Sequence, residues 1–97
     1  MSKYVVDIDG VIASIVDDLD YSKAKPIIKN ITIFNKLYKA GHEIVYFTAR
    51  GYETKKDWRI VTEGQFASWG VLYNDLLFGK PSADFYVDDK MLSMGDF

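Results

Sequence analysis

Residues that could bind a phosphate group or a metal ion follow apolar stretches at three separate places in the sequence. They are Asp7 and Asp9, then Thr48, Ala49 and Arg50, and finally Asp88 and Asp89. If each apolar stretch is a strand of a parallel sheet, all of them lie at one edge of it, where α/β sheets bind ligands. Lys80 joins them from a loop ahead of the last stretch. Carboxylates that meet at one edge repel one another unless a cation neutralises them. The pattern therefore predicts a cation-binding site.

The residue types at this edge suit magnesium and phosphate. The chain has no cysteine and a single histidine, distant from the motifs, so the available ligands are oxygens, as Mg²⁺ prefers. Arg50 as a planar fork and Lys80 as a point charge supply the positive charge that a phosphate dianion needs. Thr48 can donate a hydroxyl hydrogen bond to a phosphate oxygen. Two simpler interpretations stay open, namely an ordinary surface role for Arg50 and a solvated strand end at Asp88 and Asp89.

Strand and helix patterns alternate along the chain and place these motifs at strand ends. We expect a strand at residues 4–8 turned by Gly10, a helix from Pro26 ended by Gly41, a strand at 44–47, a helix from about Thr54 to Trp69, a third strand between 71 and 78, and a fourth strand at 84–87. This order predicts a right-handed parallel α/β sheet of about four strands with helices on its faces, which is a small Rossmann-like domain. The first strand, apolar on both faces, is expected at the centre of the sheet.

Composition narrows the class of protein. The chain has 97 residues, of which 48% are hydrophobic and 15% aromatic, as expected for a single folded domain over residues 1–97. A net charge of −2 argues against a nucleic-acid partner held by counterion release. The sequence has no apolar run near the ~20 residues of a membrane span. A cytoplasmic location, with no membrane partner, is the resulting expectation.

The ordered motifs resemble those of the haloacid dehalogenase-like phosphatase superfamily. Its Asp-x-Asp-Gly motif stands here at residues 7–10, its Thr/Ser at Thr48, its loop lysine at Lys80 and its acidic pair at Asp88 and Asp89. Softer signals are similar to small phosphatases encoded with bacterial capsule and surface-polysaccharide genes. They are the sequences at residues 48–51, 62–63, 69–70, 79–81 and 84–90.

The resemblance implies a mechanism and a set of site residues. Asp7 would attack phosphorus to give an aspartyl-phosphate, and Asp9 would act as general acid and then as general base. Lys80 would orient Asp7 and bridge to phosphate, with residues 48–50 contacting the substrate. Mg²⁺ would be held by Asp7, the Asp9 carbonyl and the acidic pair, with Asp89 in direct contact and Asp88 at a bound water. The substrate would be a small phosphomonoester, such as a sugar phosphate or polyol phosphate.

Three other functions share some of these features. The receiver domains of two-component signalling use similar residues, but their acidic pair follows the first strand, so the order here rejects them. A non-catalytic Mg²⁺-binding domain would be favoured by loss of Asp9 or Lys80, and both are present. A polynucleotide-end phosphatase stays possible, although the acidic charge balance counts against it. The spacing between motifs leaves no room for a cap domain, which predicts a homo-oligomer or a preference for bulky phosphorylated substrates.

Overall fold

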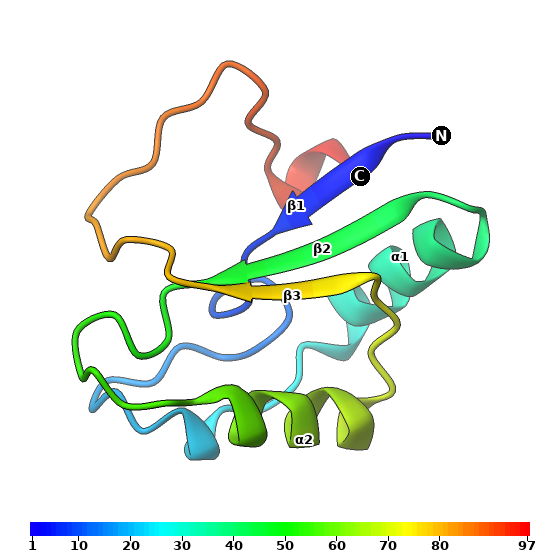
Figure 1. Ribbon diagram of the computed structural model, residues 1–97. Coiled ribbons are helices and arrows are strands. Elements are labelled where there is room, and N and C mark those ends of the chain that lie inside the picture. Colours follow the sequence, from blue (N-terminus) through cyan, green and yellow to red (C-terminus); the bar gives the residue numbers. More distant parts are fainter.

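The protein is built on a parallel sheet of three strands. The computed structural model describes residues 1–97, and its strands are β1 (Lys3–Val6), β2 (Glu43–Thr48) and β3 (Asp75–Phe78). They lie in the order β1-β2-β3, with Lys3 opposite Glu43 and Val45 opposite Asp75. Because all three strands run the same way, their carboxyl ends share one edge of the sheet (Figure 1). The expected small Rossmann-like α/β domain is thus confirmed in outline.

Two helices join the strands and lie on the same side of the sheet (Figure 1). Helix α1 (Ile28–Lys39) connects β1 to β2, and α2 (Arg59–Trp69) connects β2 to β3. Two successive right-handed crossovers that step in one direction must place both helices on one face. The sequence predicted helices on both faces of the sheet. In the structure both helices cover the same face. None of the helices is both long enough and apolar enough to cross a bilayer.

The core fills the space between the sheet and these helices. Its fully buried members include Ile8, Ile44 and Tyr46 from the sheet side, and Phe34 and Phe66 from the helices. The Tyr46 ring meets the Phe66 ring edge to face, with 5.2 Å between ring centroids, an arrangement that aromatic pairs prefer. This packing fixes the strand ends that carry the candidate site.

Helix α1 ends where the sequence indicates. Gly41 follows it with φ 97°, a left-handed conformation that glycine adopts without strain. The amide of His42 donates to the Leu37 carbonyl at 3.0 Å and so satisfies one of the last helical oxygens. The start differs by two residues from expectation, since Pro26 precedes the helix and forms an isolated bridge with Ala13.

The predicted fourth strand is wrong. Residues 84–87 form no strand, and Phe85 and Val87 are 86% and 97% exposed. The physical reason lies in the connection, because a parallel strand needs a crossover of about a dozen or more residues, and only residues 79–83 separate this segment from β3. In Figure 1 the orange segment swings away from the sheet and returns to a short 3-10 turn, η2 (Met94–Asp96), behind β1.

The position of β1 also differs from expectation. It is an edge strand paired only with β2, and Val5 is 59% exposed, so the apolar sequence on both faces did not mark the sheet centre. The central strand is β2, in which residues 44–46 are all buried. The C-terminal Phe97 packs against Tyr4 of β1 and Phe34 of α1.

Helix α2 begins five residues later than the expected start near Thr54. The intervening loop, residues 51–58, contains a left-handed non-glycine residue, Lys55, with φ 58°. The amide of Arg59 donates to the Asp57 carboxylate at 2.9 Å, and local side-chain acceptors of this kind favour a turn over a helix. The loop therefore stands between the candidate site and α2.

Candidate active site at the carboxyl edge of the sheet

Asp7 and Lys80 form an ion pair at the carboxyl edge. Asp7 lies directly after β1, and its Oδ1 accepts a 2.9 Å hydrogen bond from the amide of Ile8. Its other oxygen, Oδ2, lies 3.5 Å from Lys80 Nζ, and both side chains are partly exposed. The pair borders a cavity of about 1030 Å³ between β1 and the segment that follows Lys80. A ligand could therefore reach the Asp7 carboxylate from this side.

Burial raises the pKa of Asp7 above the ordinary aspartate value of 3.8, and the negative charge of Asp9 adds to this effect. The charge of Lys80 and the Ile8 hydrogen bond oppose the rise without cancelling it. A carboxylate that is destabilised by its surroundings is more basic and more nucleophilic than one in water. Shifted pKa values of this kind are common at functional sites.

Asp9 is held by Arg50. The guanidinium donates to the Asp9 carboxylate from Nε at 3.0 Å and from Nη2 at 2.9 Å. Arg50 follows β2 and is only 2% exposed, so the two residues join the ends of neighbouring strands through a fork geometry. Its Nη1 has acceptors in the protein as well, Thr62 Oγ1 at 3.0 Å and Gln65 Oε1 at 2.6 Å. Arg50 therefore points into the protein, away from a substrate phosphate.

The residues around Arg50 were missed by the sequence analysis. Thr62 and Gln65 lie on the face of α2 that turns toward the sheet, and Gln65 also donates to the Tyr21 carbonyl at 2.7 Å. The Tyr21 ring lies 5.0 Å from the guanidinium carbon. Tyr21 belongs to η1 (Tyr21–Lys23) in the segment between β1 and α1. The two polar residues Thr62 and Gln65 on the buried side of α2 were the available signal, since buried polar groups need hydrogen-bond partners.

Thr48 and Ala49 shape the turn that carries Arg50. Thr48 is fully buried, and its hydroxyl oxygen accepts the Arg50 amide at 3.1 Å. Its carbonyl accepts the amide of Lys80 at 3.1 Å, and the Ala49 carbonyl accepts the amide of Tyr52 at 2.9 Å. These bonds bring Lys80 and Arg50 to adjacent strand ends. Because Thr48 is fully buried, a substrate does not reach its hydroxyl in this arrangement.

Asp88 lines the same cavity as Asp7, but Asp88 and Asp89 form no metal-binding group with Asp7 and Asp9. They are exposed in the segment that leaves the sheet, and Asp88 accepts the amide of Lys90 at 2.9 Å. No group of three or more acidic, histidine or cysteine side chains that could hold a metal ion occurs anywhere in the chain. At the edge itself, Asp7 and Asp9 each already face a cation. The residues as positioned therefore do not fit a Mg²⁺ ion.

Comparisons with known proteins give a fold but no family. No family model matches the sequence, and no curated protein matches it. A structural genomics target from Vibrio cholerae is similar in structure, with a TM-score of 0.84 and 27% identity over 99% of this chain and 86% of that one. Two structures of the Pnkp1/Rnl/Hen1 complex, one described as an RNA repair complex, match with TM-scores of 0.67 and 0.64 at 16% and 18% identity.

The two Pnkp1/Rnl/Hen1 structures match this chain over only part of their own length. They cover 91% and 87% of this chain but only 30% and 27% of the matched chains. At this identity they establish the likeness of the fold alone. The chain accordingly shares its small parallel α/β architecture with part of a larger protein, and the chemistry must be argued from the edge residues.

Proposed function

We propose that the chain is a phosphomonoester hydrolase of the haloacid dehalogenase-like type, without a cap domain. The observation that carries the proposal is the Asp7–Lys80 pair, 3.5 Å apart at the carboxyl edge and open to a cavity. It is supported by the second pair, Asp9 with Arg50, on the adjoining strand ends. A nucleophile, a cation for phosphate and a second carboxylate are the groups that transfer of a phosphoryl group to the protein requires.

In the proposed reaction an oxygen of Asp7 attacks phosphorus while the bond from phosphorus to the leaving alcohol breaks. Asp9 enters the reaction protonated and gives its proton to the departing alcohol oxygen, and the resulting carboxylate takes a proton back from the water that attacks the aspartyl-phosphate. Phosphate leaves and the Asp7 carboxylate is restored, so that one ester and one water give one alcohol and one phosphate. Lys80 faces the charge that develops on the phosphoryl oxygens. Arg50 keeps the Asp9 carboxylate turned toward the edge.

Magnesium is proposed as the cofactor on the sequence motifs alone. The side chains form no group of three that could hold a metal ion, so no step of the reaction above is drawn through a metal. Dependence on Mg²⁺ is decided separately from phosphatase activity by assays with and without a chelator. Turnover that survives chelation would reject the metal and retain the hydrolase.

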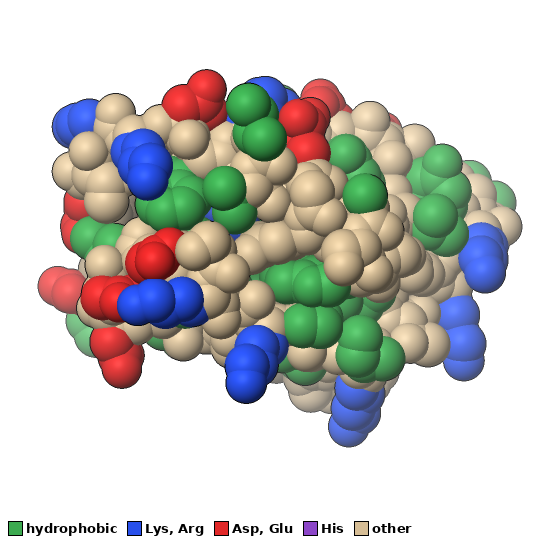
Figure 2. All heavy atoms as spheres, turned by 90° about the horizontal axis from the view of Figure 1, so that it is seen from below, with side chains coloured by type: hydrophobic (Ala, Val, Ile, Leu, Met, Phe, Trp, Pro, Cys, Tyr) green, Lys and Arg blue, Asp and Glu red, His purple; other side chains and the backbone are tan.

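The proposed substrate is a sugar phosphate or polyol phosphate of surface-polysaccharide synthesis, acted on in the cytoplasm. A polynucleotide end is the second candidate, because the Pnkp1/Rnl/Hen1 structures include a part with this fold. The net charge of −2 disfavours it, since polynucleotide affinity comes largely from basic side chains. On the face shown in Figure 2, acidic side chains are mixed with lysine and arginine side chains toward the left end.

Association into a homo-oligomer is part of the proposal. The absence of a cap leaves the edge open, and large apolar side chains such as Ile60, Phe85 and Val87 are exposed. Apolar surface of this kind favours contact with a second copy. Light scattering over a concentration series measures the mass directly. A monomer at every concentration would contradict this part alone.

The deciding experiment measures phosphate release from an aryl phosphate and from a panel of sugar, polyol and 3′-nucleotide phosphates. We expect turnover by the wild type and none by Asp7→Asn. Beryllofluoride, which mimics an aspartyl-phosphate, should bind the wild type and not the variant. A wild type that hydrolyses no ester, with or without Mg²⁺, would overturn the proposed function.

A further inference from the structure

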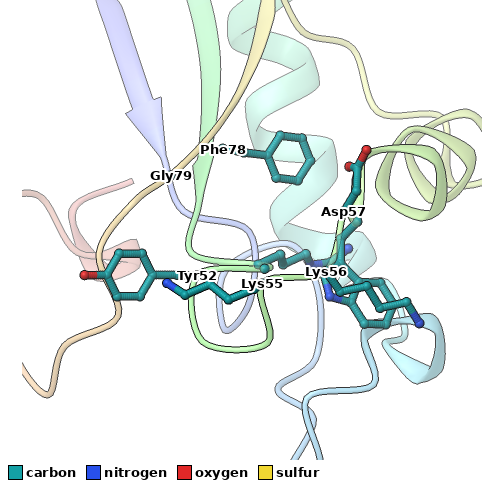
Figure 3. Close-up of a pocket in the computed structure, with 9 residues that line it drawn as sticks. Tyr52, Lys55, Lys56, Asp57, Phe78 and Gly79 are labelled. Carbon is teal, nitrogen blue, oxygen red and sulfur yellow. The ribbon is translucent and has the colours of Figure 1, made fainter.

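A second, smaller pocket adjoins the candidate site on the side of β3. Its volume is about 430 Å³, and it lies between the loop of residues 51–58 and the end of β3. Figure 3 shows Phe78 and Gly79 on the strand side and Tyr52, Lys55 and Lys56 along the loop. Gly79 immediately precedes Lys80, which contacts Asp7. The pocket therefore begins next in sequence to the lysine that pairs with Asp7, and Arg50, which holds Asp9, also lines it.

The two lysines of this pocket have no acidic partner. Neither Lys55 nor Lys56 forms an ion pair with a carboxylate. Lys55 Nζ lies 4.7 Å from the centre of the Tyr52 ring and Lys56 Nζ lies 4.6 Å from that of Trp58, and in Figure 3 they extend in opposite directions. An exposed cation–π contact is worth about 0.5–1 kcal/mol. An anion could therefore draw either ammonium group away from its ring at little cost.

The loop is built so that its backbone holds these lysines in place. A Cβ on Gly51 would lie 2.4 Å from the Lys56 carbonyl oxygen, so only glycine fits there. Thr54 Oγ1 accepts both the Lys56 amide and the Trp58 indole N–H, each at 3.3 Å. Lys55 keeps a left-handed backbone, φ 58°, in which side chains other than glycine are uncommon. A tightly closed loop that presents adjacent lysines suits recognition of a charged group.

We propose that this pocket is a specificity subsite for a second anionic group of the substrate. The inference rests on the proposed function and adds the substrate class, a small phosphomonoester that carries a carboxylate or another phosphate at its far end. One of the two lysines, Lys55 or Lys56, leaves its aromatic ring and binds the anion. The carboxylate of Asp57, which also lines the pocket, accepts hydrogen bonds from hydroxyl groups between the two charges. A phosphorylated sugar acid meets all three requirements.

The test compares substrates that differ only in the second charge. The pairs are sorbitol 6-phosphate with 6-phosphogluconate, and glycerol 2-phosphate with 2-phosphoglycerate, in which a CH₂OH group is replaced by a carboxylate. We expect kcat/KM to be about tenfold higher for the acid of at least one pair, the effect of one charge-assisted contact. The Lys55→Ala/Lys56→Ala variant should lose this preference.

The control is the Lys36→Ala/Lys39→Ala variant, which removes the same charge from exposed positions on α1 and should keep the preference. Absence of a preference in both pairs, or a preference that survives loss of Lys55 and Lys56, would overturn the subsite. A 3′-phosphorylated dinucleotide provides the alternative substrate. If it is preferred over all four esters, and the preference disappears when Lys55 and Lys56 are replaced, the assignment of the subsite to small molecules would be overturned.

A binding measurement separates failure of the subsite from failure of the proposed function. Calorimetric titration of the Asp7→Asn variant with 6-phosphogluconate and with sorbitol 6-phosphate needs no turnover. We expect about tenfold tighter binding of the acid, lost when Lys55 and Lys56 are also replaced. Tighter binding of the acid to the variant, together with a wild type that hydrolyses no ester, would support the subsite and reject the function. Equal binding of the two compounds, together with an active wild type, would reject the subsite and support the function.

Discussion

Arg50 holds Asp9 through two guanidinium nitrogens, Nε at 3.0 Å and Nη2 at 2.9 Å, from a side chain that solvent barely reaches. The same guanidinium contacts Thr62 and Gln65 of α2. The orientation of the second carboxylate is therefore set by the packing of α2 on the sheet. Arg50 is a positioning residue in this arrangement, since it acts on the proposed chemistry through Asp9.

Replacing Arg50 should lower kcat with little change in KM. Arg50→Lys keeps a positive charge but cannot make the two-point contact, so Asp9 loses its fixed orientation, and displacement of a catalytic group by about 1 Å can cost on the order of 10²-fold. Steady-state kinetics on an aryl phosphate measure both constants. A raised KM with unchanged kcat would instead assign Arg50 to substrate binding.

Stability provides a second measure of the same contact. Removing one partner of a buried ion pair destabilises a protein by about 3–5 kcal/mol, and Arg50→Met should fall near the lower end because the Asp9 side chain is 20% exposed. Denaturant unfolding gives the value. Arg59→Met is the matched control, because Arg59 is exposed and its Glu63 partner lies 3.7 Å away on the same helix. It should alter neither stability nor kcat.

Asp7→Asn should abolish turnover without lowering stability at neutral pH. Burial raises the pKa of Asp7 in the folded state, so the ionised carboxylate is less favourable there than in the unfolded chain. Its contribution to stability is greatest below the ordinary pKa of 3.8 and is lost as pH rises through the raised value. An uncharged amide avoids this loss. Melting temperatures of the two proteins at pH 4 and pH 7 check the sign, and a variant that melts well below wild type at pH 7 would contradict it.

Lys80→Met should move the acidic limb of the pH–rate profile to higher pH. The charge of Lys80 and its hydrogen bond both lower the pKa of Asp7, so their loss leaves more of the nucleophile protonated at a given acidic pH. The profile of kcat/KM from pH 4 to pH 8 measures the shift. Lys39→Met on α1 removes an equal charge from an exposed position and should leave the limb in place. An unchanged limb in Lys80→Met would show that Lys80 does not act on Asp7.

Much of the sheet and part of the site could be predicted from sequence because the signals there are local. Apolar runs marked the three observed strands, Gly41 marked the end of α1, and parallel strands brought Asp7, Arg50 and Lys80 to one edge. The orientation of Arg50 could not be predicted in this way. Whether it faces solvent or Asp9 depends on Thr62 and Gln65, which become its neighbours only after α2 has packed.

The errors at the fourth strand and at the start of α2 have a common cause. Residues 84–87 contain the aromatic and β-branched side chains typical of a strand, and residues 54–58 extend the helical pattern of α2. Each pattern shows which secondary structure the side chains favour. It does not show whether the neighbouring loop allows that structure to form. The short link at 79–83 cannot carry a parallel crossover, and the turn around Lys55 and Asp57 uses backbone conformations and acceptors that a helix excludes.

Two glycines offer opposite predictions for substitution by alanine. Gly64 lies inside α2, and a Cβ there would meet no atom within 4 Å, so the close packing that a mid-helix glycine suggests is absent. Gly64→Ala should therefore stabilise the protein by about 0.5–1 kcal/mol through helix propensity alone. For a domain of this size that corresponds to a rise of about 2–8 °C in melting temperature.

Gly51→Ala should do the opposite. Its φ is 86° and its Cβ would lie 2.4 Å from the Lys56 carbonyl oxygen, so the 51–58 loop must open to admit the methyl group. Stability should fall by about 1–3 kcal/mol, the cost of a residue forced into a rare backbone region. The preference for an acidic substrate should fall as well, because Lys55 and Lys56 lose their placement. Thermal unfolding of both variants beside wild type is sufficient, and a melting temperature for Gly51→Ala at or above that of Gly64→Ala would contradict the structure of this loop.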